Sequence, residues 1–487
     1  MTAPISTVAT AARYDAEVLI VGSGAGGATT AALLAEAGFD VLVVEEGEWV
    51  EQGSVVPFSL EQMERQYRSG GVTVALGLPS IAYTEGRCAG GGTEVNSGLY
   101  LRPPAGLLER WRTEYQIRDL DPDEMHRIGE ELEAALTVSL VPGEVSAPSK
   151  VLERGADALG WQSNESPRWM KFPPGGDAGS GERQSMTRTF LPRAHRAGAR
   201  LLTNCRVRKL AIDSVRASHA IVELADGSRG TIHFRHVFVC CGAIHTPALL
   251  QRSGLRERVG NTLAVHPTVK LAARFPEPLN TPDDVPVHQV KEFAPEISFG
   301  GSASNPGLVA LSLADNWAEF GHALHEWERV SVYYAAITSE GKGRVKAVPG
   351  LRDPLVAYHL TARDRELLRS GLSRLALLML AAGADEVYPS FHHAPVVRNR
   401  ADLATLQQAF ATTKATVMTV HLCSTVPLGE HPRCAADSYG RMRGMRNVWV
   451  NDASLLPDAP GVNPQGSVMA FAVRNARYFI EMERPRG

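Results

Sequence analysis

The stretch Val18-Leu-Ile-Val-Gly-Ser-Gly-Ala-Gly-Gly27 decides the fold, because an apolar strand runs directly into a Gly-x-Gly-x-x-Gly turn. Gly22 permits the tight turn, Gly24 lets the backbone approach a phosphate, and Gly27 lets the next helix pack closely on the sheet. The N-terminus of that helix offers free N–H groups and a positive dipole to an anion. The turn therefore predicts a binding site for a dinucleotide pyrophosphate.

The residues after the turn support this interpretation. An Ala-rich helix is expected to run to a stop at Gly38, and a second strand over 41–44 ends at Glu45, 18 residues after Gly27. An acid in this place can accept hydrogen bonds from ribose hydroxyls. The order of strand, turn, helix, strand and acid favours a dinucleotide site over a purely structural turn, and leaves FAD and NAD both open at this point.

Composition sets the outer limits. A chain of 487 residues is too long for one ordinary core, so two or more domains are expected. The 50 basic and 53 acidic residues give a net charge of −3 without long runs of one sign, which argues against a nucleic acid partner. No apolar run approaches the ~20 residues of a membrane span, and the N-terminus lacks a signal-peptide pattern. We expect a soluble, cytoplasmic protein.

No metal is expected. His392 and His393 have no third ligand nearby in the sequence, so a surface pair is the simpler interpretation. The six cysteines show neither a Cys-x-x-Cys pair nor the spacing of metal ligands, which is typical of scattered reduced thiols: Cys88, Cys205, Cys240, Cys241, Cys423 and Cys434.

Two later segments extend the nucleotide-binding pattern. Three consecutive glycines in the loop over 86–98 suit a backbone that closely approaches a planar or phosphate ligand, although a flexible surface loop would look similar. A strand is predicted over 200–207, and a buried strand over 237–241 leads to a helix with Thr246 as its cap and Pro247 at its first position. We expect this second strand-Gly-helix unit to rejoin the first sheet.

The chain resembles the glucose-methanol-choline (GMC) oxidoreductases, which are FAD-dependent. The resemblance covers nearly the whole chain except about 280–410. It is carried by the 22–27 fingerprint with Glu45, the 86–96 loop, the segments 242–254 and 259–267, and the C-terminal blocks 420–429, 437–441, 447–457 and 461–465.

This resemblance implies an active site at the C-terminal end of the chain. The position of His421 matches the family's active-site histidine, and Asn463 matches its partner, which is histidine or asparagine. Asp452-Ala453 resembles the flavin-binding pair of the family. The candidate FAD-binding residues are Gly22, Gly24, Gly27, Glu45, Gly91, Gly92, Asn96, Val207, Gly242, Asp452, Ala453, Asn463 and Pro464.

The chemistry of these residue types fits alcohol oxidation. As hydride leaves carbon for flavin N5, the hydroxyl proton must be removed, and a histidine such as His421 has a suitable pKa for a general base. An amide such as Asn463 can hydrogen-bond the substrate oxygen. A helix starting after Pro464 would aim its N-terminus at the flavin pyrimidine edge. The competing roles are a hydrogen-bonded core histidine for His421 and a helix cap for Asn463.

Two departures from the family pattern matter. The usual His-Pro-x-Gly-Thr run appears as His421-Leu-Cys-Ser-Thr425, with Leu for Pro and Ser for Gly. At Val95 some members carry a histidine that bonds covalently to the flavin, so the aliphatic side chain here implies non-covalent FAD.

We therefore predict an α/β fold, α+β overall. A Rossmann-like FAD-binding domain would comprise 14–105, 185–268 and 410–487. A discontinuous substrate-binding domain, an antiparallel sheet plus helices, would comprise 106–184 and 269–409. In these insertions we expect a helix over 122–140, a strand over 329–337 and a helix over 362–382.

The expected activity is oxidation of a small-molecule alcohol to an aldehyde or ketone, with oxygen or another acceptor reoxidising the flavin. Acids and aromatics are interspersed in 283–328 and could bind a polyamine-bearing sugar, as in bacterial relatives of aminoglycoside assembly, although solvated loop charges explain them equally well. A sterol, an aliphatic or benzylic alcohol, a simple sugar and a non-redox FAD-containing lyase remain as alternatives. The acids are Asp283, Asp284, Glu292, Glu296, Asp315, Glu319, Glu326 and Glu328, and the aromatics are Phe293, Phe299, Trp317, Phe320 and Trp327.

Overall fold

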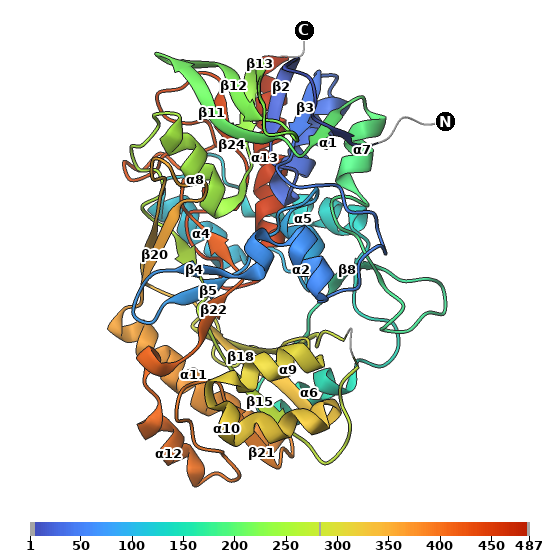
Figure 1. The fold of residues 1–487 in the computed structure, drawn as a ribbon, viewed down its shortest axis with the longest axis vertical. Helices are drawn as coiled ribbons and strands as arrows, with labels where there is room; N and C mark the ends of the chain where they lie inside the picture. The colour runs from blue at the N-terminus through green and yellow to red at the C-terminus, as the bar shows by residue number, and fades with distance from the viewer. Residues whose placement is uncertain (1–4, 282–283, 485–487) are drawn as a thin grey trace.

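The protein was analysed as a computed structural model, which describes residues 5–281 and 284–484. Within these ranges two large sheets occupy opposite halves of the molecule (Figure 1). The first sheet has the strand order β1-β10-β3-β2-β13-β12-β11, and β24 also pairs with β13. Its strands are β1 (Thr7–Val8), β10 (Arg200–Thr203), β3 (Val41–Val44), β2 (Arg13–Val21), β13 (Arg229–Val239), β12 (Arg216–Glu223), β11 (Arg206–Asp213) and β24 (Val448–Val450).

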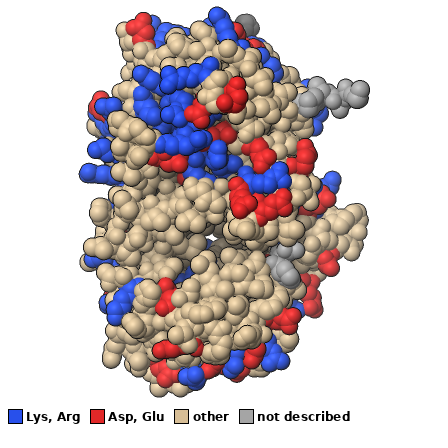
Figure 2. Space-filling view, viewed as in Figure 1, with Lys and Arg blue, Asp and Glu red and all other residues tan. Residues whose placement is uncertain are grey.

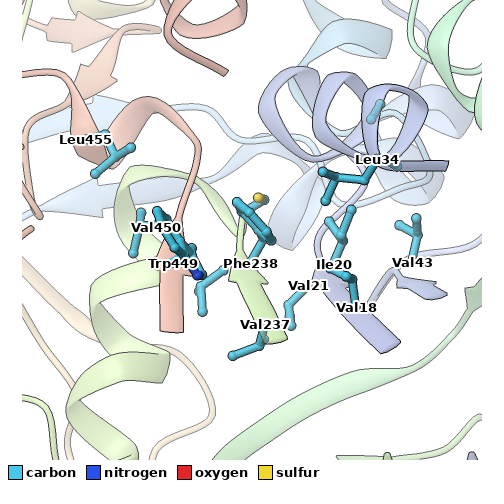
Figure 3. Packing of buried hydrophobic residues seen from close by; sticks show 14 of the residues in the cluster. Val18, Ile20, Val21, Leu34, Val43, Val237, Phe238, Trp449, Val450 and Leu455 are labelled. Carbon is cyan, nitrogen blue, oxygen red and sulfur yellow. The ribbon is translucent and has the colours of Figure 1, made fainter. Parts of the chain in front are cut away.

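The first sheet is parallel around the glycine turn. β2 pairs in parallel with β3 and β13, while β12 and β11 continue the sheet as an antiparallel hairpin. The apolar run of β2 is buried on both faces, as expected of a strand in a parallel sheet. Figure 3 shows Val18 and Ile20 packed near Leu34 of α1 (Ala25–Glu36), with Phe238 and Trp449 beside them. A Rossmann-like fold is thereby confirmed.

Two local predictions for the first sheet need correction. The strand expected over 200–207 is two strands, because Asn204 has a φ of +52° and ends β10 before β11 begins at Arg206. Helix α8 (Gly242–Arg252) starts at Gly242, so Thr246 is not its cap and Pro247 lies inside it. Pro247 is accommodated because Ala243 O, which its missing N–H would have bonded, accepts the hydroxyl of Thr425 at 2.6 Å.

The second sheet is mainly antiparallel and has the order β4-β5-β22-β15-β18-β17-β16-β7, with β21 also paired to β15. Helices α6 (Ala147–Leu159) and α11 (Ala362–Ala381) pack against it. Its strands are β4 (Thr73–Ala75), β5 (Ile81–Tyr83), β22 (Val417–Thr419), β15 (Thr268–Arg274), β18 (Val330–Ile337), β17 (Ile297–Gly301), β16 (His288–Val290), β7 (Ser163–Glu165) and β21 (Glu386–Pro389).

In the two insertions, the predicted helices and strand are present, but their first or last residues differ from the prediction. The helix expected over 122–140 is α5 (Pro122–Ala135), which stops because Thr137 takes a φ of +50°. The strand over 329–337 and the helix over 362–382 are confirmed as β18 and α11, each shorter by one residue. β4, β5 and β22 come from segments expected in the nucleotide-binding domain but pair in the second sheet. The division into two domains stays a prediction.

The remaining elements lie outside the two large sheets. The helices are α2 (Leu60–Gln66), α3 (Gly92–Val95), α4 (Ala105–Glu114), α7 (Phe190–Arg196), α9 (Pro306–Leu313), α10 (Trp317–Phe320), α12 (Asp402–Ala409) and α13 (Gln465–Glu483), with 3-10 turns at 68–71, 314–316, 321–329, 412–414 and 453–455. The strands are β6 (Val138–Ser139), β8 (Arg168–Lys171), β9 (Glu182–Arg183), β14 (Ala264–Val265), β19 (Lys342–Lys346), β20 (Leu355–His359) and β23 (Leu422–Cys423).

Helix α13 links the two halves. It runs from the junction of the halves to the far end of the first sheet, so that its N-terminal residues lie where the halves meet (Figure 1). Figure 2 shows a hollow at this junction, bordered on this face mostly by uncharged residues. Over the described ranges, every helix is too short or too polar to span a membrane.

Candidate active site

The three fingerprint glycines have different structural roles. Gly22 has a φ of +101°, and a Cβ there would overlap the carbonyl oxygen of Cys240. A Cβ on Gly27 would overlap the carbonyl oxygen of Gly22. Gly24 has ordinary backbone angles, and the nearest atoms to a Cβ built on it lie 4.0 Å away. The fold therefore requires Gly22 and Gly27, whereas Gly24 borders open space at the N-terminus of α1.

Glu45 lies at the end of β3 beside this turn. Its carboxylate accepts hydrogen bonds from Ser23 N at 3.1 Å, Ser23 Oγ at 2.7 Å and Gly47 N at 2.9 Å. Burial raises the pKa of Glu45, while these hydrogen bonds favour its charged form. A carboxylate accepts about four hydrogen bonds, so one acceptor position is left for a ligand hydroxyl.

Two further glycines border open space. A Cβ built on Gly92, at the start of α3, or on Gly242, at the start of α8, would meet no atom within 4 Å. A Cβ on Gly91 would lie 3.1 Å from the Cα of Gly24, so the glycine loop approaches the fingerprint turn closely. The glycine backbones thus form a cradle that side chains would fill, and this cradle fits a phosphate-bearing planar cofactor.

Asp452 connects the beginning of α8 to the C-terminal block. Its Oδ2 accepts from Gly242 N at 2.8 Å and from the Thr246 hydroxyl at 2.5 Å, and its Oδ1 accepts from Ser454 N at 2.8 Å and Ser454 Oγ at 2.5 Å. Burial raises the pKa of Asp452, against the effect of these hydrogen bonds. Ala453 follows in the same turn, so the predicted pair borders the cradle through Gly242.

The remaining candidate residues also lie near this cradle. Val207 is buried in β11, two residues after Cys205, whose N–H donates to the carbonyl of Glu45 at 2.8 Å. Asn96 Nδ2 donates to Oε1 of Gln465 at 2.7 Å and so joins the glycine loop to the first residue of α13. Pro464 is the N-cap of that helix, so Asn463 is not a helix cap.

His421 and Asn463 meet in a cavity at the junction of the two halves. His421 Nε2 lies 3.4 Å from Asn463 Nδ2, and Asn463 Oδ1 accepts from Gln289 Nε2 at 3.3 Å. His266 lines the same cavity. The second sheet forms one wall through Gln289, Lys291, Ser298, Tyr334 and Ala336.

The hydrogen bonds of His266 define the proton positions of both histidines. Gly461 N donates to His266 Nε2 at 2.9 Å, so neutral His266 carries its proton on Nδ1. That Nδ1 lies 2.8 Å from His421 Nδ1, which must then accept. Neutral His421 consequently carries its proton on Nε2, which faces Asn463. Asn463 Nδ2 is also a donor. In this protonation state the 3.4 Å contact between His421 Nε2 and Asn463 Nδ2 therefore joins two donors and holds no hydrogen bond.

Both histidines are neutral at neutral pH. Burial lowers the pKa of His421 well below its usual value, and the neighbouring His266 and Lys291 add to the effect. Burial, with a smaller contribution from Lys291, lowers the pKa of His266 to about 4. An uncharged imidazole at His421 is the form that a general base requires.

Little in the sequence pointed to the wall opposite the histidines. His266 appeared only within a family-like segment, and nothing local distinguished Gln289, Lys291 or Tyr334. The signal lies in strand register, because Gln289 pairs with Gly300 and Gly300 with Tyr334 across β16, β17 and β18, which puts these residues on one sheet face.

The acids of 283–328 do not line the cavity within the described residues. Glu296 forms an ion pair with Arg363, and Glu292 accepts from Gln162 N. Among the aromatics, Phe293 and Phe299 pack with Trp161 in the core. Asp283 lies outside the described residues. In the described part of the chain, no three His, Cys, Asp or Glu side chains gather as a metal site.

Comparison with protein families gives three matches. The N-terminal model of the GMC oxidoreductases matches residues 63–268, and the C-terminal model matches residues 339–472. An NAD(P)-binding Rossmann-like domain model matches residues 20–50, which contain the glycine fingerprint.

Several curated proteins are similar over nearly the full chain. An uncharacterized GMC-type oxidoreductase of Sinorhizobium fredii is 42% identical over 95% of this chain and 94% of its own length. One from Mycobacterium tuberculosis is 33% identical over 94% of this chain and 75% of its own length. A long-chain-alcohol oxidase of Arabidopsis thaliana is 23% identical over 94% of this chain and 68% of its own length.

Solved structures share the fold at low sequence identity. The pyridoxine 4-oxidase from Mesorbium loti has a TM-score of 0.71 and 20% identity, over 95% of this chain and 99% of that one. The formate oxidase of Aspergillus oryzae has a TM-score of 0.73 and 15% identity, over 98% and 99%. Family and fold together support a flavin cofactor. The chain belongs to the GMC oxidoreductase family.

Proposed function

We propose that this oxidoreductase uses non-covalently bound FAD to oxidise an alcohol to an aldehyde or ketone. The observation that carries the proposal is the meeting of His421 and Asn463 in one cavity, with His421 Nε2 at 3.4 Å from the Asn463 amide. When bound, the flavin supplies the acceptor for the hydride. The fingerprint glycines, Glu45 and the glycine loop over 90–92 would hold it.

The residues of the chain would handle the proton. His421 accepts the hydroxyl proton at Nε2 in the tautomer that carries its own proton on Nδ1. Reaching that tautomer requires three proton movements: the His266 Nδ1 proton passes to His421 Nδ1, solvent takes the proton from His421 Nε2, and solvent protonates His266 Nε2 at the expense of the Gly461 hydrogen bond. Asn463 Nδ2 donates to the substrate oxygen and stabilises its developing negative charge.

The substrate class expected from the acids of 283–328 has no support at the cavity. A polyamine-bearing sugar needs carboxylates near the histidines, whereas the charged side chain of the described lining is Lys291. The similar proteins include one named for long-chain alcohols and one named for pyridoxine. Membership in the family therefore does not identify the alcohol that this protein oxidises.

Anaerobic mixing of the yellow holoenzyme with a panel of alcohols tests the proposal. Loss of the visible flavin absorbance with one class of alcohol is the expected result, and the rate of its return in air separates an oxidase from a dehydrogenase. A flavin that no member of a broad panel bleaches, in a protein that cleaves cyanohydrins, would replace oxidation by the lyase alternative.

A further inference from the structure

Lys291 is a half-buried cation in the candidate active site, and the described residues offer it no counter-charge. It lines the cavity and follows β16 two residues after Gln289, on the same side of the extended chain. Its Nζ makes no hydrogen bond or ion pair with any residue in 5–281 or 284–484. The lysines that form ion pairs in these ranges are Lys150 and Lys342.

Lys270 adds a second cation on the same sheet face. It lies on β15 directly opposite Tyr334 of β18, and paired residues of neighbouring strands point to the same face. Tyr334 lines the cavity, so this face is the cavity wall. Like Lys291, Lys270 has no acidic partner among the described residues.

Two half-buried ammonium groups with no acidic partner among the described residues carry a free-energy cost. Transfer of a charge out of water is unfavourable unless an opposite charge or several hydrogen bonds compensate. Burial accordingly lowers the pKa of Lys270 and of Lys291 to about 8 each. Most of each ammonium population is still protonated at neutral pH, so the wall carries positive charge beside two neutral histidines.

We propose that Lys291, supported by Lys270, binds an anionic group of the substrate, so that the preferred alcohol carries a carboxylate or a phosphate. A ligand anion would supply the counter-charge that residues 5–281 and 284–484 do not provide, and charge-assisted hydrogen bonds are the stronger ones. Gln289, Ser298 and Tyr334 offer neutral donors on the same wall. The inference names the substrate class of the proposed function and rests on it.

Binding of unreactive anions tests the subsite without turnover. The holoenzyme is titrated in a calorimeter with butyrate, with inorganic phosphate and with the neutral analogue butyramide. Butyrate or phosphate should bind more tightly than butyramide, and whichever binds identifies the anionic group. Lys291→Met should weaken that binding about tenfold or more, as expected for loss of a hydrogen bond to a charged group.

Two control variants accompany the titration. Lys291→Arg keeps the charge and should retain most of the binding, whereas Lys209→Met removes an exposed lysine of β11 and should change nothing. Equal binding of the anions and butyramide, or equal binding to the native protein and Lys291→Met, would overturn the subsite.

The pH dependence gives an independent measurement. The titratable groups that face Lys291 are His266, His421 and Tyr334, with Lys270 on the same wall. The histidine pKa values lie below 6.5, and burial raises the pKa of Tyr334 to about 12. Above neutral pH the lysines are therefore the first of these groups to change charge. Binding of the anion should weaken as the pH rises above about 8, and pH-independent binding there contradicts the proposal.

The experiments distinguish an error in the anion subsite from an error in the proposed function. If neutral alcohols bleach the flavin as well as anionic ones and no anion binds, the subsite is wrong and alcohol oxidation stands. If the anions bind through Lys291 and no alcohol bleaches the flavin, the subsite stands and alcohol oxidation is wrong.

Discussion

The Nδ1 atoms of His266 and His421 lie 2.8 Å apart, although 155 residues separate them in the chain. A hydrogen bond at this distance holds one proton, and the Gly461 N–H at His266 Nε2 assigns that proton to His266. His421 is thereby held with Nε2 towards the cavity. A proton taken up at Nε2 must be matched by a shift of the protons within the pair, so the two histidines act as one unit.

His421→Ala should leave flavin binding intact and slow flavin reduction by about 10²-fold or more, because the proton acceptor is lost. Stopped-flow reduction of the flavin by the best alcohol measures this effect. His392→Ala, which removes an exposed histidine that does not line the cavity, is the matched control, and its flavin should be reduced at the native rate. Equal rates in both variants would remove His421 from the mechanism.

The native enzyme should keep its rate of flavin reduction below pH 6.5. Burial lowers the pKa of His421 well below that value, so the base form persists as the pH falls. Activity is lost only when the pH falls through the lowered pKa, because a protonated His421 cannot accept the substrate proton. A pH profile of flavin reduction by one alcohol locates this acid limb, and a midpoint at or above 6.5 would contradict the burial effect.

His266→Ala should slow flavin reduction about tenfold or more and move the acid limb to higher pH. The substitution removes the ring that holds His421 Nδ1 and admits water beside His421, which relieves the burial that lowers its pKa. Rates measured across pH separate this outcome from a purely structural defect, which would lower the rate without moving the limb.

Gly24→Val should abolish retention of the flavin while leaving the fold intact. A Cβ on Gly24 meets no protein atom closer than 4.0 Å, so the added methyl groups fill the space reserved for the cofactor. Gly27→Ala should instead destabilise the protein, since its Cβ overlaps the carbonyl oxygen of Gly22. Flavin content and thermal unfolding separate the two effects, and a yellow Gly24→Val protein would show that the turn has another role.

Arg68→Met should destabilise the protein by about 3 kcal/mol, as for a broken buried ion pair. Arg68 is buried and forms ion pairs with Glu46 at 3.0 Å and with Asp353 at 3.2 Å. Burial acts to raise the pKa of Glu46, but Arg68 and Arg206 hold it well below its usual value. This contribution to stability is present above the unfolded pKa of about 4.5 and is lost as the pH falls below it.

Urea unfolding at neutral and acidic pH measures the effect of Arg68→Met. The difference from the native protein should shrink as the pH falls below about 4.5, because Glu46 is then protonated in the unfolded chain while the folded protein still holds it charged. Arg13→Met, which breaks an exposed ion pair with Asp15, should cause no measurable change. A loss of stability with Arg68→Met that is the same at both pH values would assign the loss to packing instead of charge.

The sequence by itself determined the features that depend on a few neighbouring residues. The turn after β2, the strand over 41–44 and the stop of α1 before Gly38 follow from glycine conformations and from runs of buried residues. The family motifs around His421 and Asn463 likewise lie within short segments. The ends of α5 and β10 were missed because single residues there adopt a positive φ that no local pattern signals.

Only the tertiary structure decided how distant residues meet. The start of α8 depends on Asp452, which holds Gly242 N from 210 residues away. His266 meets His421 because β14 pairs with β23, which places the residues next to the paired Val265 and Leu422 side by side. Lys291 reaches the same cavity from the end of β16 in the second sheet. Strand register decides which side chains face the cavity. A shift of one residue in the pairing of a strand would turn each of its side chains to the opposite face of the sheet. The physical reason is that these contacts join strands and turns that are distant in sequence, so no local pattern along the chain encodes them.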